Sequence, residues 1–131
     1  MSARRREYHL TDQAEPVSHY AHAVQAGDLL FVSGIVPVDR DGRLVGAGDV
    51  VAQARSVFAN MRDVLAAAGC TFADVAKVTV FLTDIADRPL VNPVRQDVFG
   101  EARPASTLVE VSALVTPGAR IEVEAIALVP S

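Results

Sequence analysis

Two glutamates that share one face of a predicted strand are the first residues in this sequence suited to chemistry. Glu122 and Glu124 alternate with the apolar residues Ile121, Val123 and Ala125, and this period of two predicts a strand with one polar and one apolar face. Carboxylates arranged in this way either lie on a solvated face or form part of a polar pocket, where one would act as a general acid or base. The pattern alone leaves both alternatives open.

A second group of titratable side chains lies near the N-terminus, where His19, Tyr20 and His22 follow one another closely. Histidine titrates near neutral pH, so either histidine would act as an acid or base, or bind an anion when protonated. The alternative is that they only make hydrogen bonds at an interface. The third histidine, His9, completes no metal-ligand spacing, so no metal site is predicted.

The elements that must position these residues follow from hydrophobic periodicity. Apolar residues recur at helical spacing over 50–68, with Asp49 as an N-cap and Gly69 as the residue that ends the helix. Alternation and turn signals predict strands at 6–10, 21–26, 28–33, 75–83, 103–111 and 121–127.

The segment from Asp84 to Gly100 is expected to hold a second, shorter helix, whose start is complicated by Pro93. Proline lacks a donor N–H and disfavours the α conformation in the residue before it. The helix therefore either begins near Pro89 with Pro93 in its first turn, or is capped by Asn92 and starts at Pro93. The order of strands and helices predicts an α+β domain with both helices on one face of a single mixed sheet. The opposite face must then meet another subunit.

Ordered motifs along the chain resemble the Rid (reactive intermediate deaminase, YjgF) family. The similarity extends from about Tyr20 to Val129. Each motif is ordinary strand or turn sequence by itself, whereas their order and spacing together are specific. The motifs are Phe31-Val-Ser-Gly34, Gly69 after the long helix, Val75-Ala-Lys-Val-Thr-Val-Phe-Leu-Thr-Asp84, Val91-Asn92, Pro104-Ala105, Val109-Glu-Val111 and Ile121-Glu-Val-Glu-Ala-Ile-Ala127.

The resemblance implies a chorismate-mutase-like fold, a homotrimer whose sheets form a central barrel, and clefts between subunits that deaminate a small imine or enamine without a cofactor. Glu122 matches the family's glutamate, which orients or deprotonates the attacking water. Tyr20 matches a pocket tyrosine, and Ser33, Gly34 and Asn92 match positions that line the cleft. Gly34 would let a ligand approach the backbone closely.

The residue at position 106 departs from the family pattern. Active imine deaminases of the family carry Pro-Ala-Arg-Ser, in which the arginine binds the substrate carboxylate. Because Pro104-Ala105 and Val109-Glu-Val111 fix the register, Ser106 takes the arginine's place. Serine cannot reproduce a planar, charged, bidentate guanidinium, so a conventional 2-imino acid is not the expected substrate. The alternative to an enzyme is a trimer that binds a small metabolite or a protein partner without catalysis.

Ser106 would still contact the substrate, either as a polar remnant or as a hydrogen-bond donor to a neutral ligand. It is not expected to belong to a Ser/His/Asp triad, because it lacks the strand-to-helix turn that exposes a hydrolase serine. His22, Arg120 and Arg103 are candidates to replace the missing cation. Arg120 is two residues before Glu122, so the alternation of the strand would place both side chains on the same face. Arg95 would lie at the edge of the cleft.

Composition limits the remaining possibilities. The 131 residues fit one domain, 1–131, with residues 1–6 expected to be mobile. A net charge of −4 and 5% aromatic residues argue against a nucleic-acid partner and therefore against an endoribonuclease. No signal peptide or membrane span is predicted, and a single cysteine, Cys70, suits a reducing cytoplasm. Half of the residues are hydrophobic and only 21% are charged, which favours an oligomer.

Overall fold

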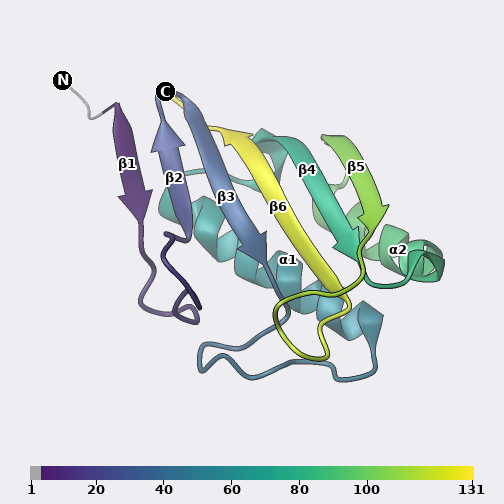
Figure 1. Ribbon diagram of the computed structural model, residues 1–131. Coiled ribbons are helices and arrows are strands. Elements are labelled where there is room, and N and C mark those ends of the chain that lie inside the picture. The colour runs from purple at the N-terminus through teal and green to yellow at the C-terminus, as the bar shows by residue number, and fades with distance from the viewer. Residues whose placement is uncertain (1–3) are drawn as a thin grey trace.

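Six strands pair in the order β1-β2-β3-β6-β4-β5 to form one sheet in the computed structural model, which describes residues 4–131. Only β4 and β5 pair in parallel, so the sheet is mixed. Both α-helices cover the same face (Figure 1). The predicted α+β fold with two helices on one face of a mixed sheet is therefore confirmed. The elements are β1 (Arg5–Tyr8), β2 (Ala23–Ala26), β3 (Leu29–Ile35), α1 (Val50–Ala67), the 3-10 helix Phe72–Asp74, β4 (Val75–Leu82), the 3-10 helix Ile85–Asp87, α2 (Arg88–Phe99), β5 (Ala105–Glu110) and β6 (Ile121–Leu128).

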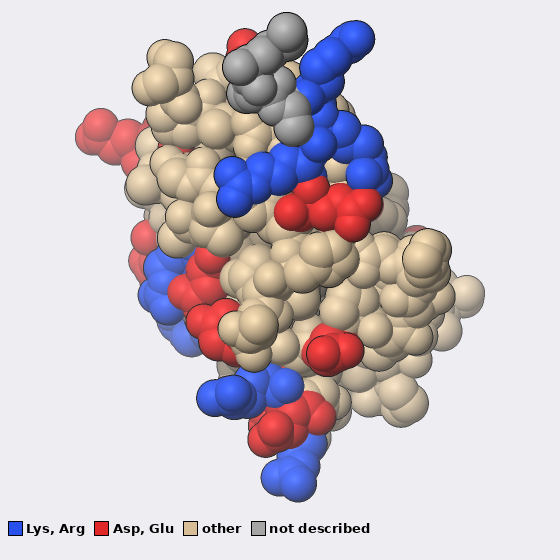
Figure 2. Space-filling model, turned by 90° about the vertical axis from the view of Figure 1, so that its left-hand side faces the viewer, with Lys and Arg blue, Asp and Glu red and all other residues tan. Residues whose placement is uncertain are grey.

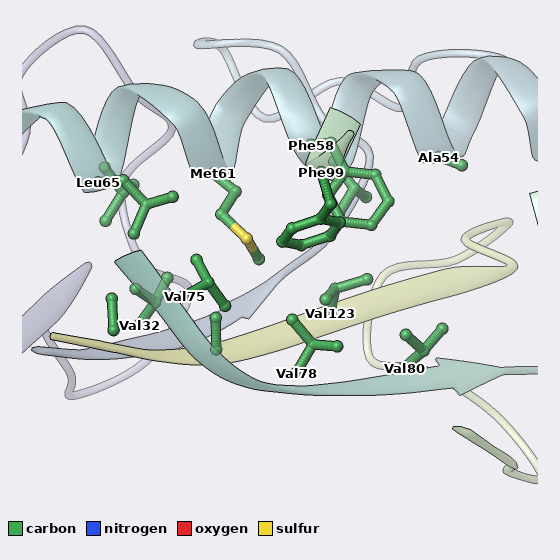
Figure 3. Packing of buried hydrophobic residues seen from close by; sticks show 14 of the residues in the cluster. Val32, Ala54, Phe58, Met61, Leu65, Val75, Val78, Val80, Phe99 and Val123 are labelled. Atoms are coloured by element: carbon green, nitrogen blue, oxygen red, sulfur yellow. The ribbon is translucent and has the colours of Figure 1, made fainter. Parts of the chain in front are cut away.

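The long helix α1 carries the centre of the core. Asp49 caps its first turn by accepting a hydrogen bond from the Ala52 N–H at 3.1 Å, and Gly69 follows its end with a φ of +76°, both as predicted. The buried stripe of α1 packs on apolar side chains of the sheet and on Phe99 of α2 (Figure 3). Each such side chain contributes roughly 1.5–3 kcal/mol when fully buried.

Helix α2 begins at Arg88, which decides between the two predicted starts. Pro89 lies in the first turn, where a missing N–H costs nothing. Pro93 lies inside the helix, one turn later than predicted. Asn92 is also inside the helix and does not cap it, so its side chain is available for other contacts.

The edge of the sheet at β1 differs slightly from the predicted one. The strand begins at Arg5, whereas it was predicted to start at residue 6. Of the segment 1–6 that was expected to be mobile, residues 1–3 lie outside the described part, while Arg5 and Arg6 belong to β1. Figure 2 faces this edge and shows basic and acidic side chains gathered along it. Charged side chains on an edge strand discourage pairing with another chain.

The sheet face that the helices leave uncovered is partly apolar. Leu29 and Phe31 of β3, Val109 of β5 and Leu128 of β6 are 38–54% exposed on it. In the part of the chain that the structure describes, no helix is long and apolar enough to cross a bilayer.

Candidate functional site

A cavity of about 730 Å³ lies beside the C-terminal half of β3 and brings together five of the predicted site residues. Tyr20 comes from the segment before β2, and His22 directly precedes that strand. Ser33 and Gly34 come from β3, and Glu122 comes from the neighbouring β6. Residues that are far apart in the sequence therefore surround one carboxylate.

The Glu122 carboxyl group lies against the backbone of Gly34. The register of β3 on β6 shifts between Val32 and Ile35, so Gly34 lies in a bulge. A β-carbon built on Gly34 would lie 2.9 Å from Cδ of Glu122, closer than ordinary contact allows. The absence of a side chain at position 34 therefore makes room for the carboxylate, and not only for a ligand.

Burial raises the pKa of the Glu122 carboxyl, and the charge of Glu124 on the same face raises that pKa further. A carboxylate whose pKa moves toward neutrality is a stronger base and, once protonated, a more readily available acid.

His22 is held by the backbone on both sides of its ring. The Leu10 N–H donates to Nδ1 at 3.0 Å, and Nε2 lies 2.9 Å from the carbonyl oxygen of Ala14. Because Nδ1 accepts, Nε2 must carry the proton and donate it to Ala14. His22 thus fixes segment 10–14 of its own chain, part of which lines the cavity. His19 is exposed and does not line this cavity.

Ser33 also positions the wall of the cavity. Its hydroxyl donates to the Ala21 carbonyl at 2.7 Å, and its N–H donates to the carbonyl of His22 at 3.1 Å. These bonds fasten the two residues that follow Tyr20, which is 45% exposed at the cavity. The hydroxyl proton of Ser33 is engaged and is not free for a ligand.

Several lining residues were not found from the sequence. Asn60 of α1 lines the cavity while donating to the Val38 carbonyl at 2.9 Å. Val17 and Val115 lie at its edge, 75% and 82% exposed. These residues come from helix and loop segments with no distinguishing pattern, so only the tertiary structure reveals them.

Two predicted residues, Asn92 and Ser106, lie elsewhere. Asn92 lines a second cavity of about 390 Å³ together with Arg95 and Arg103. Ser106 accepts a hydrogen bond from the Arg95 guanidinium at 2.8 Å. It pairs in parallel register with the buried Val78, so its side chain is on the helix-covered side of the sheet. Glu122 is on the other side, and one chain does not bring Ser106 and Glu122 together.

Arg120 lines neither of these two cavities of the single chain. Its guanidinium forms an ion pair with the buried Asp87, with Nη2 2.7 Å from Oδ1 and Nε 3.1 Å from Oδ2. Its backbone N–H donates to Oε1 of the buried Gln53 at 2.7 Å. Arg120 precedes the first residue of β6, so the alternation of the strand does not set its direction.

Among residues 4–131, no cluster of three or more histidine, cysteine or acidic side chains is arranged to hold a metal ion. Cys70 is buried, and burial raises the pKa of its thiol, with the charge of Asp74 as the second cause. A thiol in this state is a poor nucleophile.

Comparisons with known proteins agree on one family. Residues 11–129 match the family model described as Endoribonuclease L-PSP. The chain is 40% identical to the 3-aminoacrylate deaminase RutC of Acinetobacter baylyi, over 86% of this chain and 88% of that protein. It is 36% identical to the human 2-iminobutanoate/2-iminopropanoate deaminase, over 86% of this chain and 81% of that protein.

The fold is also shared with solved structures. A protein of the conserved Rid family from Yersinia pestis, YyfA, described as of unknown function, superposes with a TM-score of 0.90 at 35% identity. The match covers 95% of this chain and 99% of that one.

Proposed function

Because the chain belongs to the endoribonuclease L-PSP family, also called the Rid or YjgF family, we propose that it is a hydrolase that deaminates a small imine or enamine. The observation that carries this proposal is the half-buried Glu122 carboxylate, which lies against Gly34 in a cavity and has a raised pKa. Relatives at 36–40% identity are named as deaminases of this kind.

The proposed reaction needs one group that moves a proton twice. An enamine first takes a proton at its β-carbon from solvent, which gives the same protonated imine that an imine substrate forms directly. Glu122 takes a proton from water as the water oxygen bonds to the carbon of the protonated imine, and the C=N double bond becomes the single bond of a neutral carbinolamine. The protonated Glu122 then donates to the amino nitrogen, and the C–N bond breaks as the hydroxyl group loses its proton to solvent, so that a carbonyl compound and ammonia leave. General acid–base catalysis of this kind contributes about 10²–10⁴-fold to the rate.

We propose that the site is completed between subunits of a homotrimer, in which the sheets form a central barrel. Leu29, Phe31 and Leu128 on the uncovered sheet face support burial against another copy. Ser106 and Glu122 are on opposite sides of the sheet in one chain, so a cleft that uses both needs two chains. In this arrangement Tyr20 and the backbone at Gly34 shape one wall.

The substrate is proposed to differ from a conventional 2-imino acid. Ser106 stands where active imine deaminases of the family have a carboxylate-binding arginine, which would place this chain in a subgroup without that arginine. A serine offers one hydroxyl where the arginine offers a charged, bidentate fork. Because the Acinetobacter relative is named as a 3-aminoacrylate deaminase, we propose this enamine as the first compound to test.

Two other functions remain as rivals. A trimer that binds a metabolite or a protein partner would use the same cavity but needs no activated water. RNA cleavage, which the family description names, is disfavoured by the net charge of −4 and the few aromatic side chains. A cytoplasmic location is also proposed, because the single Cys70 suits a reducing compartment.

The test compares two glutamates on the same face of β6. Glu122→Gln keeps the size of the side chain but removes its basicity, and it should lower ammonia release from 3-aminoacrylate by about 10²–10⁴-fold. Glu124→Gln is the matched control and should change the rate much less, because Glu124 is exposed and does not line the cavity. Equal effects of the two variants, or an unchanged rate in Glu122→Gln, would remove Glu122 from the mechanism. If the wild type binds a ligand in this cavity but shows no turnover, the binding function is favoured.

A further inference from the structure

The second cavity contains a cation that has no acidic partner. Arg95 extends from α2, is partly buried, and lines this cavity with Arg103. In the described part of the chain, no carboxylate lies within 4.0 Å of either guanidinium. The acids nearest in sequence, Asp97 and Glu101, are exposed and do not line the cavity.

An unpaired cation that is removed from water is costly unless a ligand pairs with it. Burial lowers the pKa of the Arg95 guanidinium, and repulsion from Arg88 lowers it further. The surroundings of Arg95 are therefore basic. An anion entering this cavity would meet a desolvated guanidinium with no competing internal counter-ion.

The contact between Arg95 and Ser106 connects this cation to the departure from the family sequence. Arg95 Nη2 donates to Ser106 Oγ at 2.8 Å. A serine hydroxyl that accepts from arginine still has its own proton to donate. The remaining N–H groups of Arg95 and the hydroxyl proton of Ser106 together form a set of donors that suits a carboxylate.

We infer that Arg95, together with Ser106, binds the carboxylate of the substrate and so determines its specificity. That the bound carboxylate belongs to a substrate rests on the proposed function, whereas binding of the carboxylate does not require turnover. The guanidinium reaches the site from α2, whereas an arginine at position 106 would reach it from β5. The bound carboxylate thus takes a different position relative to the reacting carbon, which fits a substrate other than a 2-imino acid.

The test is binding of a stable carboxylate to the full-length wild-type protein, measured by calorimetric or NMR titration. 3-Hydroxypropanoate is the probe, and its neutral amide, 3-hydroxypropanamide, is the matched ligand without charge. The wild type should bind the carboxylate at least about tenfold more tightly than the amide, because the neutral amide cannot form the bidentate charged contact. Equal affinities, or no binding of the carboxylate, would overturn the inference.

Variants assign the binding to one arginine. Arg95→Gln should weaken carboxylate binding about tenfold or more and remove the preference over the amide, and Ser106→Ala should weaken binding less. Arg62→Gln is the control, since Arg62 is an exposed arginine of α1 outside both cavities. Unchanged affinity in Arg95→Gln, or loss of binding only in Arg103→Gln, would contradict the assignment.

A separate result distinguishes this inference from the proposed reaction. Glu122→Gln should keep carboxylate binding, because it preserves the size of the side chain and the proposed contacts with the carboxylate come from Arg95 and Ser106. If Arg95→Gln loses binding while Glu122→Gln leaves turnover intact, the anion site stands and the proposed mechanism fails. If Glu122→Gln loses turnover while Arg95→Gln leaves binding intact, the mechanism stands and the anion site fails.

Discussion

The carboxyl group of Glu122 fills the space in which a side chain at Gly34 would lie. A β-carbon at position 34 would lie 2.9 Å from Cδ and 3.3 Å from Cγ of Glu122. Gly34 is not among the glycines with positive φ, so backbone conformation does not require a glycine there. The requirement is space for the carboxyl group, and this makes the two positions interdependent.

Gly34→Ala should therefore displace Glu122 while the backbone of β3 stays as it is. The added methyl group would meet the end of a flexible side chain that borders a cavity, so we expect it to cost less than the roughly 1–3 kcal/mol of unfolding free energy typical of overpacking. The displaced carboxylate would also lose its place over the bulge, and we expect turnover to fall about 10²-fold, as for a small misplacement of a catalytic group. Urea unfolding and ammonia release measure the two effects.

A double variant tests whether that cost comes from this contact. In Gly34→Ala/Glu122→Ala the methyl group no longer meets a carboxyl, so the stability lost in Gly34→Ala should largely return. The two changes would then be strongly non-additive. Additive effects would show that alanine at position 34 disturbs something other than Glu122.

The raised pKa of Glu122 predicts a dependence of stability on pH. A carboxyl whose pKa is higher in the folded state favours folding when protonated, below its unfolded pKa of about 4.3. That stabilisation is lost as the pH rises through the raised folded pKa. Glu122→Gln should consequently have a higher melting temperature than the wild type at pH 7, with the difference closing below about pH 4. A difference that stays constant with pH would contradict the raised pKa.

Local signals in the sequence predicted the elements well. The limits of α1 were found because Asp49 and Gly69 act within one turn of the helix ends. The alternation that placed Glu122 on the face opposite Val123 also holds, because it follows from the geometry of a strand. These features depend only on neighbours in the chain.

Features that depend on distant parts of the chain were not predicted. Arg120 was placed with Glu122 by extending the alternation past the start of β6, but Asp87, which lies 33 residues away, binds its guanidinium. Val115 and Asn60 reach the cavity from a loop and from α1. The position of Ser106 beside Arg95 depends on how α2 packs beside β5, which no local pattern reveals.

Ser106→Arg should raise activity on simple 2-imino acids, on which we expect the wild type to show little activity. A bidentate charged contact with the substrate carboxylate contributes on the order of 10-fold or more to kcat/KM. Because the new arginine would lie beside Arg95, the double variant Arg95→Gln/Ser106→Arg should show the larger gain. The measurement is ammonia release from 2-imino acids formed in situ. Robust turnover by the wild type would show that another cation already performs this role.

The Asp87–Arg120 pair should support the fold without taking part in the reaction. Asp87 is 4% exposed, and removing one partner of a buried pair typically costs about 3–5 kcal/mol. Because the Arg120 side chain is 34% exposed, we expect roughly 2–4 kcal/mol for Asp87→Ala. Urea unfolding measures the loss, and kcat of the folded fraction should change little. A large fall in kcat at full stability would return Arg120 to the site.

Assembly into a trimer should depend on the uncovered sheet face. Light scattering should give a mass of three times 13.9 kDa, because each Å² of apolar surface buried between subunits contributes about 25 cal/mol before the cost of association. Phe31→Asp places a charge on that face and should shift the mass toward 13.9 kDa. Leu90→Asp is the matched control, since Leu90 is an exposed apolar residue of α2 on the other side of the molecule. If both variants remain trimers, the contact lies elsewhere. A wild type that is monomeric at micromolar concentration would exclude a cleft shared between chains, because Glu122 and Ser106 would then have no means of meeting.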